Sequence, residues 1–190
     1  MLIGLGGKLQ SGKDTVFNII KDLRPEAEKF YFTENMKRSA AAIFDIDPEV
    51  WEDWKNNSRA IIILKTQQGV HSKLTVREFL QRYGTEAHRD IFDENFWLDD
   101  MLPEELDHSG RLIVFKDMRM PNEIDRIIQL GGFTVKIEKD GLPTSDHSTE
   151  REIPDELIDW HLDNNGTYEE LKNNVKTMLK VFEETNVITN

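Results

Sequence analysis

The sequence predicts an α/β fold in which a parallel sheet is flanked by helices. Short apolar segments alternate with helix-like segments, a glycine-rich turn follows the first of them, and a later buried segment ends in an aspartate. Strands that alternate with amphipathic helices are typical of βαβ units, whose strands pair in parallel. The 190 residues suffice for one domain of ordinary size with a small insertion.

Apolar spacing defines the N-terminal elements. Leu2–Leu5 predict a strand, and the segment after the glycines predicts a helix with one apolar stripe. That helix ends before Pro25, because a residue preceding proline avoids helical dihedrals. The stripe consists of Val16, Ile19, Ile20 and Leu23. A strand over 30–32, an Ala-rich helix over 36–44 and a short helix from Pro48 carrying Trp51 and Trp54 follow.

The middle of the chain is less regular. Residues 56–72 are polar apart from Ala60–Leu64 and predict no definite element. Thr75 and Glu78 then have the spacing of a capping box, which predicts the start of a helix. Its apolar stripe consists of Val76, Phe79, Leu80, Tyr83 and Ala87.

The C-terminal part continues the alternation of strands and helices. Arg111–Lys116 predict a buried strand, and Pro121–Leu130 predict a helix that stops at two glycines. The remaining expectations are a strand over 133–137, a polar surface loop over 140–152, a strand over 158–162 and a helix over 168–182.

Composition excludes several classes of function. A formal net charge of −12 works against binding a nucleic-acid polymer, because phosphate neutralisation requires clustered Lys and Arg. The absence of cysteine excludes disulfides, thiolate zinc sites and thiol catalysis. No apolar run approaches the length of a membrane helix, and no secretory signal is expected.

The strongest motif is the segment Gly7–Lys13, called here the glycine loop, which has the spacing G-x-x-x-x-G-K between a predicted strand and a predicted helix. Glycines let backbone N–H groups curl around a phosphate, and the helix that follows points its positive end at the same group. Lys13 adds a cation, and Thr15 offers a hydroxyl for Mg²⁺, with Asp14 between them. The alternative is a strand-to-helix turn that binds nothing.

A second candidate site follows the strand 111–116. Ligands of open parallel sheets bind beyond the carboxyl ends of strands. Asp117 lies there, Arg119 offers a planar fork for a phosphate, and Glu123 can orient Arg119 or contact substrate. A salt-bridged helix start explains the same residues without a ligand.

Three arginines at positions 77, 82 and 89 form a third candidate, since a basic group is unusual in so acidic a chain. Arg82 and Arg89 share a helical face if the helix continues past Gly84. A solvated helical face is the alternative, and for Arg82 it is the better one.

Several separated motifs resemble the deoxynucleoside monophosphate kinases of bacteriophages and their bacterial relatives. They are GKLQSGKDT, FYFTENMKRSAAAIF, LTVREFLQRYGTEAHRD, FW at 96–97 and FKDMRMPNEID followed by GG, and the likeness spans residues 1–185. Lys116 stands where the strand of this family usually carries a small or neutral residue.

The resemblance implies a three-layer P-loop kinase fold similar to adenylate kinase, built as a single domain over 1–190. It implies a helical acceptor-binding insertion around 36–105 and a lid at 140–153, where a surface loop is an equally good interpretation. The implied activity transfers the γ-phosphate of ATP, with Mg²⁺, to a deoxynucleoside 5′-monophosphate. The implied location is cytoplasmic, in the host for a phage protein. Independently of the resemblance, the apolar residues in Trp51–Leu64 could serve a homodimer, but a role in the core explains them better.

The resemblance also assigns residues to roles. ATP phosphates and Mg²⁺ would be held by Gly7, Lys8, Ser11, Gly12, Lys13, Asp14 and Thr15, with the metal on Thr15. Asn165 lies in a late segment, Asn164–Thr167, that resembles an adenine-contacting loop; a turn capping the last helix through Thr167 explains it equally well. The acceptor would contact Lys37, Arg77, Gly84, Thr85, Arg89, Trp97, Asp117, Arg119 and Glu123. Lys13, Arg89, Arg119 and Asp117 would be catalytic.

Two other functions fit the same sequence. One is another P-loop small-molecule kinase, such as a dephospho-coenzyme A kinase-like enzyme. The other is a non-catalytic nucleotide-binding protein that retains the glycine loop for stability or switching.

Overall fold

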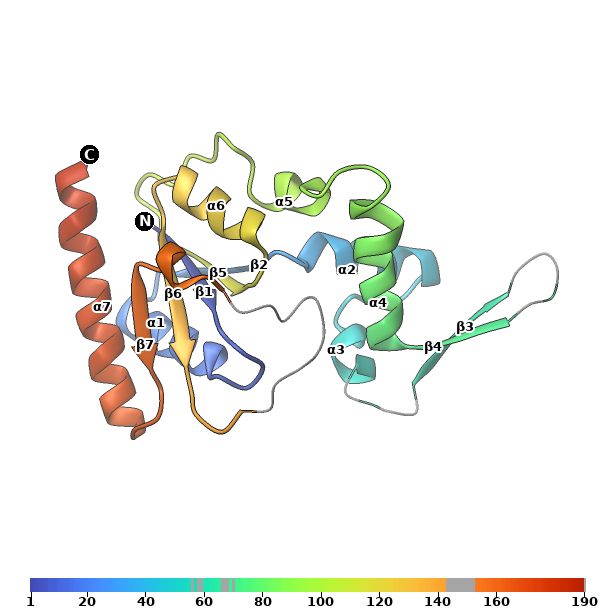
Figure 1. Cartoon of the computed structure of the whole chain (residues 1–190), viewed down its shortest axis with the longest axis horizontal. Helices are drawn as coiled ribbons and strands as arrows, with labels where there is room; N and C mark the ends of the chain where they lie inside the picture. The colour runs from blue at the N-terminus through green and yellow to red at the C-terminus, as the bar shows by residue number, and fades with distance from the viewer. Residues whose placement is uncertain (56, 58–59, 66–68, 70, 143–152, 190) are drawn as a thin grey trace. The chain divides into compact units, whose positions relative to one another are not determined.

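The computed structural model describes all residues except 56, 58–59, 66–68, 70, 143–152 and 190. The chain divides into two compact units (Figure 1). Unit 1 comprises residues 1–32 and 102–190, and unit 2 comprises residues 33–101. Unit 2 is therefore an insertion within the sequence of unit 1, and its bounds lie close to the expected insertion at 36–105.

Unit 1 is built on a five-stranded sheet with the order β2-β5-β1-β6-β7. Every neighbouring pair is parallel, which confirms the predicted α/β class with a parallel sheet flanked by helices. The strands are β1 (Leu2–Gly6), β2 (Glu28–Tyr31), β5 (Ile113–Met118), β6 (Phe133–Glu138) and β7 (Trp160–Asp163). The central strand β1 is buried along its whole length.

Helices cover both faces of this sheet. α1 (Lys13–Leu23) and α7 (Tyr168–Thr189) share one core with Ile3 and Leu5 of β1. The residue between them, Gly4, faces α6 (Pro121–Gln129), because a Cβ added there would lie 3.3 Å from Ile127 Cγ1. Successive residues of a strand point to opposite faces. The sheet thus has α1 and α7 on one side and α6 on the other, which gives three layers.

Local sequence signals account for the ends of these helices. Pro121 is the first residue of α6, and Gly131 follows its end with φ of 68°, a left-handed conformation that favours glycine. The backbone N–H of Glu170 donates to the hydroxyl of Thr167 at 3.3 Å, and the Glu170 carboxylate accepts from the Thr167 N–H at 2.7 Å. Thr167 therefore caps α7, as the sequence allowed.

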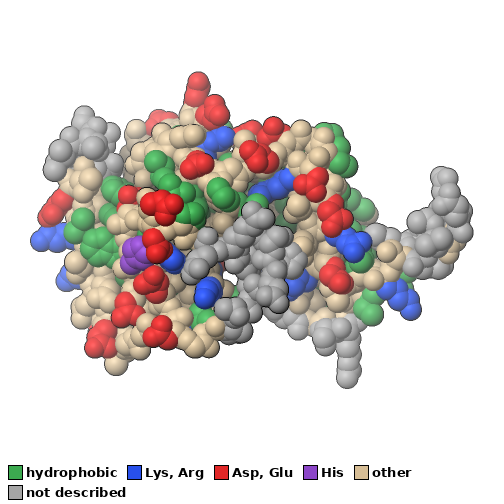
Figure 2. Space-filling model, viewed as in Figure 1, with side chains coloured by type: hydrophobic (Ala, Val, Ile, Leu, Met, Phe, Trp, Pro, Cys, Tyr) green, Lys and Arg blue, Asp and Glu red, His purple; other side chains and the backbone are tan. Residues whose placement is uncertain are grey.

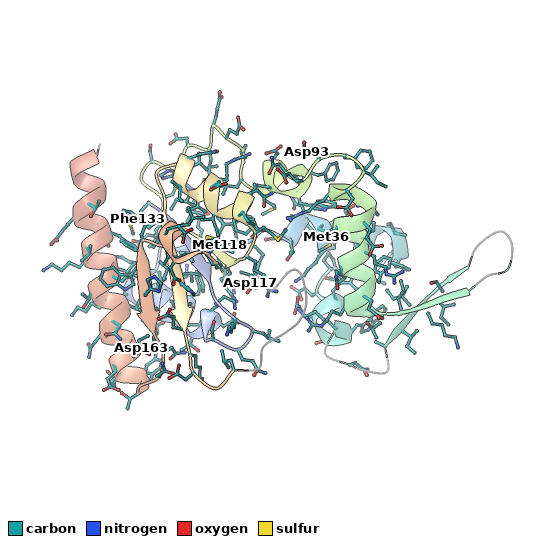
Figure 3. The ribbon with its side chains drawn as sticks, in the orientation of Figure 1. Met36, Asp93, Asp117, Met118, Phe133 and Asp163 are labelled. Carbon is teal, nitrogen blue, oxygen red and sulfur yellow. The ribbon has the colours of Figure 1, made fainter. Side chains whose placement is uncertain are left out.

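Unit 2 packs its helices around an aromatic core that includes Trp51, Phe79 and Trp97. Its elements are α2 (Glu34–Phe44), α3 (Val50–Lys55), β3 (Ile61–Lys65), β4 (His71–Thr75), α4 (Val76–Gly84), the π-helix η1 (Thr85–Arg89) and α5 (Phe96–Met101). The predicted capping box at the start of α4 is present, since Thr75 and Glu78 exchange hydrogen bonds. Figure 3 labels Met36, which lies in this core on α2.

Three expectations about elements were wrong in part. The segment given no definite element contains an antiparallel hairpin of β3 and β4, with Ile62 turned into the core while Ile61 and Ile63 are exposed. β5 begins at Ile113 rather than Arg111, whose side chain instead pairs with Glu28. β7 begins at Trp160, because the short 3-10 helix η3 (Asp155–Leu157) precedes it.

Most of the loop expected to act as a lid, 140–153, lies outside the described residues. No helix in the described part of the chain is long and apolar enough to cross a membrane. Asp and Glu side chains are spread over the face shown in Figure 2, in keeping with the net charge of −12.

Candidate functional site

The glycine loop connects β1 to α1 in a conformation that only small residues permit at two positions. Gly7 has φ of 138° and Gly12 has φ of 101°. A Cβ on Gly7 would lie 2.7 Å from the carbonyl oxygen of Ile137, and one on Gly12 would lie 2.3 Å from Nδ2 of Asn164. Glycine is therefore required here by both backbone conformation and space.

The loop ends at an open helix N-terminus. Gly12 is the N-cap of α1, and among the described residues no side-chain hydrogen bond caps the helix there. The first N–H groups of a helix have no partner within the helix and carry the positive end of its dipole. Ser11, directly before, is buried, and its hydroxyl has no hydrogen-bond partner in the described part of the molecule. These donors suit an anion, which is the chemistry expected of a phosphate-binding loop.

Lys13 places its ammonium over the glycine loop. The Nζ atom donates to the carbonyl oxygens of Gly7 and Lys8, both at 2.8 Å, and lies 3.4 Å from a carboxylate oxygen of Asp117. Burial lowers the pKa of Lys13, the Asp117 carboxylate opposes this shift, and the positive charge of Arg119 adds to it. A buried cation held by carbonyl oxygens is ready to exchange them for phosphate oxygens.

Asp117 reaches the loop because β5 carries an irregularity there. Leu5 pairs with Lys116 and Gly6 pairs with Met118, so that Asp117 is an extra residue in the pairing. It adopts a left-handed conformation with φ of 63°. Asp117 and Met118 lie at the C-terminal end of the strand (Figure 3), where ligands of parallel sheets bind. A bulge of this kind re-aims a side chain next to a site.

Arg119 follows at the same edge of the sheet. Its guanidinium lies 3.6 Å from Asp117 and remains about a third exposed. The buried carboxylate of Glu123 accepts hydrogen bonds from the backbone N–H groups of Arg119 at 2.8 Å and Met120 at 3.0 Å. Glu123 thus fixes the turn that presents Arg119.

Comparison with known proteins identifies the family of this chain. The family model for deoxynucleotide monophosphate kinase matches residues 49–175. The chain belongs to the deoxynucleotide monophosphate kinase family. The resemblance stated from the sequence motifs is thereby confirmed.

Individual relatives agree with the family. A putative deoxynucleotide monophosphate kinase of Acanthamoeba polyphaga mimivirus is 28% identical over 186 residues, which cover 90% of this chain and 91% of the viral protein. The deoxynucleotide monophosphate kinase of Enterobacteria phage T4 is 28% identical over 117 residues, covering 60% of this chain and 48% of the phage protein. The aligned part thus spans about half the length of the phage relative.

Among solved structures, shikimate kinase from Aquifex aeolicus aligns over the full length of both chains with a TM-score of 0.43 and 14% identity. The protein TT1252 from Thermus thermophilus aligns over 95% of this chain and 96% of its own with a TM-score of 0.47 and 16% identity.

The kinase-family residues of unit 1 gather at the C-terminal edge of its sheet. The residues that the sequence assigned there are joined by contacts between the glycine loop, α1 and β5. Gly7, Lys8, Ser11, Gly12, Lys13, Asp14 and Thr15 form the loop and first turn, and Asp117, Arg119 and Glu123 form the strand end and turn. Their individual roles in binding and catalysis stay predictions.

The acceptor residues expected in unit 2 have varied surroundings. Lys37 contacts Glu52, and Trp97 is buried in the core with its indole N–H donating to the carbonyl oxygen of Gly84 at 3.1 Å. Arg77 is exposed on the first turn of α4, whereas Arg89 ends the π-helix and is half-buried. Thr85 begins that π-helix. Contact of these residues with an acceptor stays a prediction.

Asn165, expected near adenine, accepts a hydrogen bond from the Asp140 N–H at 2.8 Å and donates to Asp163 at 2.7 Å. Its neighbour Asn164, which the sequence did not single out, lies closer to the loop: its side-chain amide donates to the carbonyl oxygen of Ser11 at 2.7 Å. The close approach of Asn164 to Gly12 is a consequence of the order of strands, which sequence spacing alone does not reveal.

Lys116 is the second residue of the site that sequence reasoning did not use. Its side chain is 3% exposed, and its ammonium contacts the carboxylate of Asp14 in the first turn of α1. The sequence held a signal for it, since a lysine inside an otherwise apolar run must find a partner where it is buried.

Proposed function

We propose that the protein catalyses ATP-dependent phosphorylation of deoxynucleoside 5′-monophosphates, giving ADP and the deoxynucleoside diphosphate. The observation that carries the proposal is the glycine loop at the end of β1, with Lys13 folded over it and Asp117 of β5 beside it. Membership of the deoxynucleotide monophosphate kinase family supports the choice of acceptor.

In this mechanism the donor is fixed by backbone and cation together. The N–H groups of the loop and of the first turn of α1 bind the ATP phosphates, and Lys13 exchanges its loop carbonyls for the terminal phosphate oxygens. Asp14 contributes its backbone N–H to phosphate binding, because its carboxylate is paired with Lys116. The Ser11 hydroxyl, buried without a partner in the described part of the molecule, is a further donor for a phosphate oxygen.

The residues present fit a magnesium ion. Mg²⁺ is usually held in kinases by one or two protein oxygens together with substrate phosphates, so a cluster of three or more ligands is not required. Thr15, half-buried in the first turn of α1, offers a hydroxyl, and Asp117 offers a carboxylate at the adjacent strand end. When bound, the ion neutralises charge on the β- and γ-phosphate oxygens.

Transfer then requires little covalent chemistry from the protein. The nucleophile is a phosphate oxygen of the acceptor, which is ionised at neutral pH, so Asp117 needs no role as a general base. Arg119 has a guanidinium that is about a third exposed, able to stabilise charge on the transferring group. Arg89 and Arg77 of unit 2, with Lys37, Gly84, Thr85 and Trp97, are proposed to bind the acceptor.

The experiment that tests the function measures ADP release from ATP and Mg²⁺ with each of the four deoxynucleoside monophosphates and with dephospho-coenzyme A. Turnover of at least one deoxynucleoside monophosphate is expected. Turnover of dephospho-coenzyme A alone would favour the other kinase class, and ATP binding without transfer to any acceptor would favour a nucleotide-binding protein. We also propose a cytoplasmic location, because ATP and deoxynucleoside monophosphates occur there.

A further inference from the structure

Two lysine–aspartate pairs cross between the glycine loop and the end of β5. Lys13 lies 3.4 Å from Asp117, while Lys116 contacts Asp14, so that neighbouring residues on each segment exchange partners. The first pair belongs to the phosphate-binding machinery proposed above. The side chain of Lys116 has no contact with the phosphates in that proposal, although it is one of the most deeply buried cations among the described residues of unit 1.

Lys116 is held in its charged form. The Lys116 ammonium donates a hydrogen bond to the Asp14 carboxylate, and this ion pair offsets the cost of burying the charge. The ammonium also lies 5.0 Å from the centre of the Tyr31 ring, a distance at which the face of an aromatic ring attracts a cation.

The two members of the pair differ sharply in exposure. The Lys116 side chain is 3% exposed, whereas the Asp14 side chain is 78% exposed at the first turn of α1. Asp14 is therefore a carboxylate placed beside the open N–H groups that are proposed to bind phosphate. The positive end of the helix dipole stabilises a carboxylate in this position. The same carboxylate repels a bound polyphosphate, because like charges a few ångströms apart are unfavourable.

The five charged side chains around the glycine loop carry a net positive charge, which attracts an anion, only if Lys116 is included. Lys13, Lys116 and Arg119 are cationic, while Asp14 and Asp117 are anionic. Lys116 is close enough to Lys13 to lower the pKa of the Lys13 ammonium. Without Lys116 the group would be neutral, in a chain whose net charge is −12.

We propose that Lys116 is a positioning residue that neutralises the Asp14 carboxylate beside the glycine loop and thereby strengthens the binding of the ATP phosphates. The inference rests on the proposed ATP site and extends it to a residue outside the loop. A purely structural role makes a different prediction, because removing either member of a structural pair would impair the site equally. If Lys116 compensates the charge of Asp14, removing Lys116 weakens ATP binding and removing Asp14 does not.

The test measures the Kd of ATP in EDTA, without magnesium, by titration calorimetry for wild type, Lys116→Met, Asp14→Asn and the double variant. Lys116→Met is expected to raise the Kd about three- to tenfold at low ionic strength, with a smaller effect at high salt, where exposed charges are screened. Asp14→Asn alone is expected to bind ATP as tightly as wild type or more tightly. In the double variant, Asp14→Asn is expected to restore the Kd to within about twofold of the wild-type value.

Arg111→Met is the matched control. Arg111 precedes the same strand at its other end, where its guanidinium pairs with Glu28 through two hydrogen bonds of 2.9 Å. This variant removes a cation that lies just before β5 and breaks an ion pair without altering the loop end of the sheet. The Kd of ATP is expected to stay at the wild-type value.

An unchanged Kd in Lys116→Met, or equal weakening by Lys116→Met and Asp14→Asn, would overturn the inference. Should Lys116→Met fail to fold, Asp14→Asn and Asp14→Lys decide, because Asp14 is exposed: weaker binding by either contradicts charge compensation. Wild type that binds ATP but phosphorylates no acceptor refutes the proposed function and leaves this inference standing. Wild type that binds no ATP refutes both.

Discussion

The side-chain amide of Asn164 donates a hydrogen bond to the carbonyl oxygen of Ser11, which joins the end of β7 to the glycine loop across most of the chain. The backbone N–H of Asn164 in turn donates to the carbonyl oxygen of Glu138 at 2.9 Å, at the end of β6. The loop is thereby attached to two strands that do not precede or follow it in sequence.

Replacing Asn164 with Ala is expected to loosen this attachment. Loss of one hydrogen bond costs about 0.5–1.5 kcal/mol in the free energy of unfolding. Asn164→Asp should be worse, since a carboxylate would face the Ser11 carbonyl and repel phosphate. Both variants should weaken ATP affinity, measured by calorimetry. Thr134→Val, which removes a buried hydroxyl that is hydrogen-bonded to Leu157 and Asp159 at the other end of β6, serves as the control with unchanged affinity.

Replacing Lys13 with Met is expected to abolish the rise in Tm that ATP produces in wild type, because the cation that faces the phosphates is lost. Lys8→Met, which keeps the Lys8 carbonyl that accepts from Lys13, should retain most of this rise. Thermal unfolding with and without ATP measures both. A full ATP-dependent shift in Lys13→Met would remove Lys13 from the site.

Removing Arg119 or Arg89 should lower kcat/KM rather than folding stability. Each Arg→Ala substitution is expected to cost about 2–4 kcal/mol of transition-state stabilisation. Arg119→Lys should recover little of the kcat/KM that Arg119→Ala loses, because lysine lacks the planar guanidinium fork. Arg82→Ala is the control: Arg82 is exposed and lies 3.9 Å from Glu86, so steady-state kinetics should stay near wild type. Wild-type kcat/KM in both Arg89→Ala and Arg119→Ala would contradict the assignment.

The ion pairs of Glu52 predict a pH dependence in unit 2. Burial would raise the pKa of the Glu52 carboxyl, but Lys37 and Lys55 outweigh it and lower the pKa to about 2. The stabilisation is therefore complete above the unfolded pKa near 4.5 and is lost as the pH falls towards 2. Because the side chain is half exposed, solvent screening limits its contribution to less than about 1 kcal/mol.

The measurement compares the Tm of wild type and Glu52→Gln from pH 7 downwards. At neutral pH wild type should be slightly more stable, and the difference should shrink below about pH 5. A difference that stays constant through the acid range would show that Glu52 acts through packing instead.

Much of unit 1 was predictable because its signals are local or follow from strand alternation. The apolar stretch at Leu2–Leu5, the stripe on α1 and the Pro121 and Gly131 signals of α6 each point to one structure. The location of the glycine loop and Asp117 at the same edge of the sheet also follows from the sequence, since carboxyl ends of parallel strands share one edge. The hairpin of β3 and β4 was missed because its strands are short and lie among polar residues.

Other parts of the site depend on pairing that spacing cannot show. Asn164 lies in a turn-like sequence, and its contact with Ser11 requires β7 to be at the edge next to β6. The irregularity that frees Asp117 arises where β5 slips by one residue against β1. Such relationships are set by tertiary structure, and no short segment encodes them.

The neighbouring strands β2 and β5 are separated in sequence by all of unit 2. During synthesis, β2 leaves the ribosome long before its partner exists, and pairings between distant segments slow folding because a long loop must close first. The segments of unit 2 are contiguous in sequence, so unit 2 can form its core before β5 is available to pair with β1 and β2. Pulse-labelling hydrogen exchange on the refolding chain should therefore find Phe79 protected before Val114.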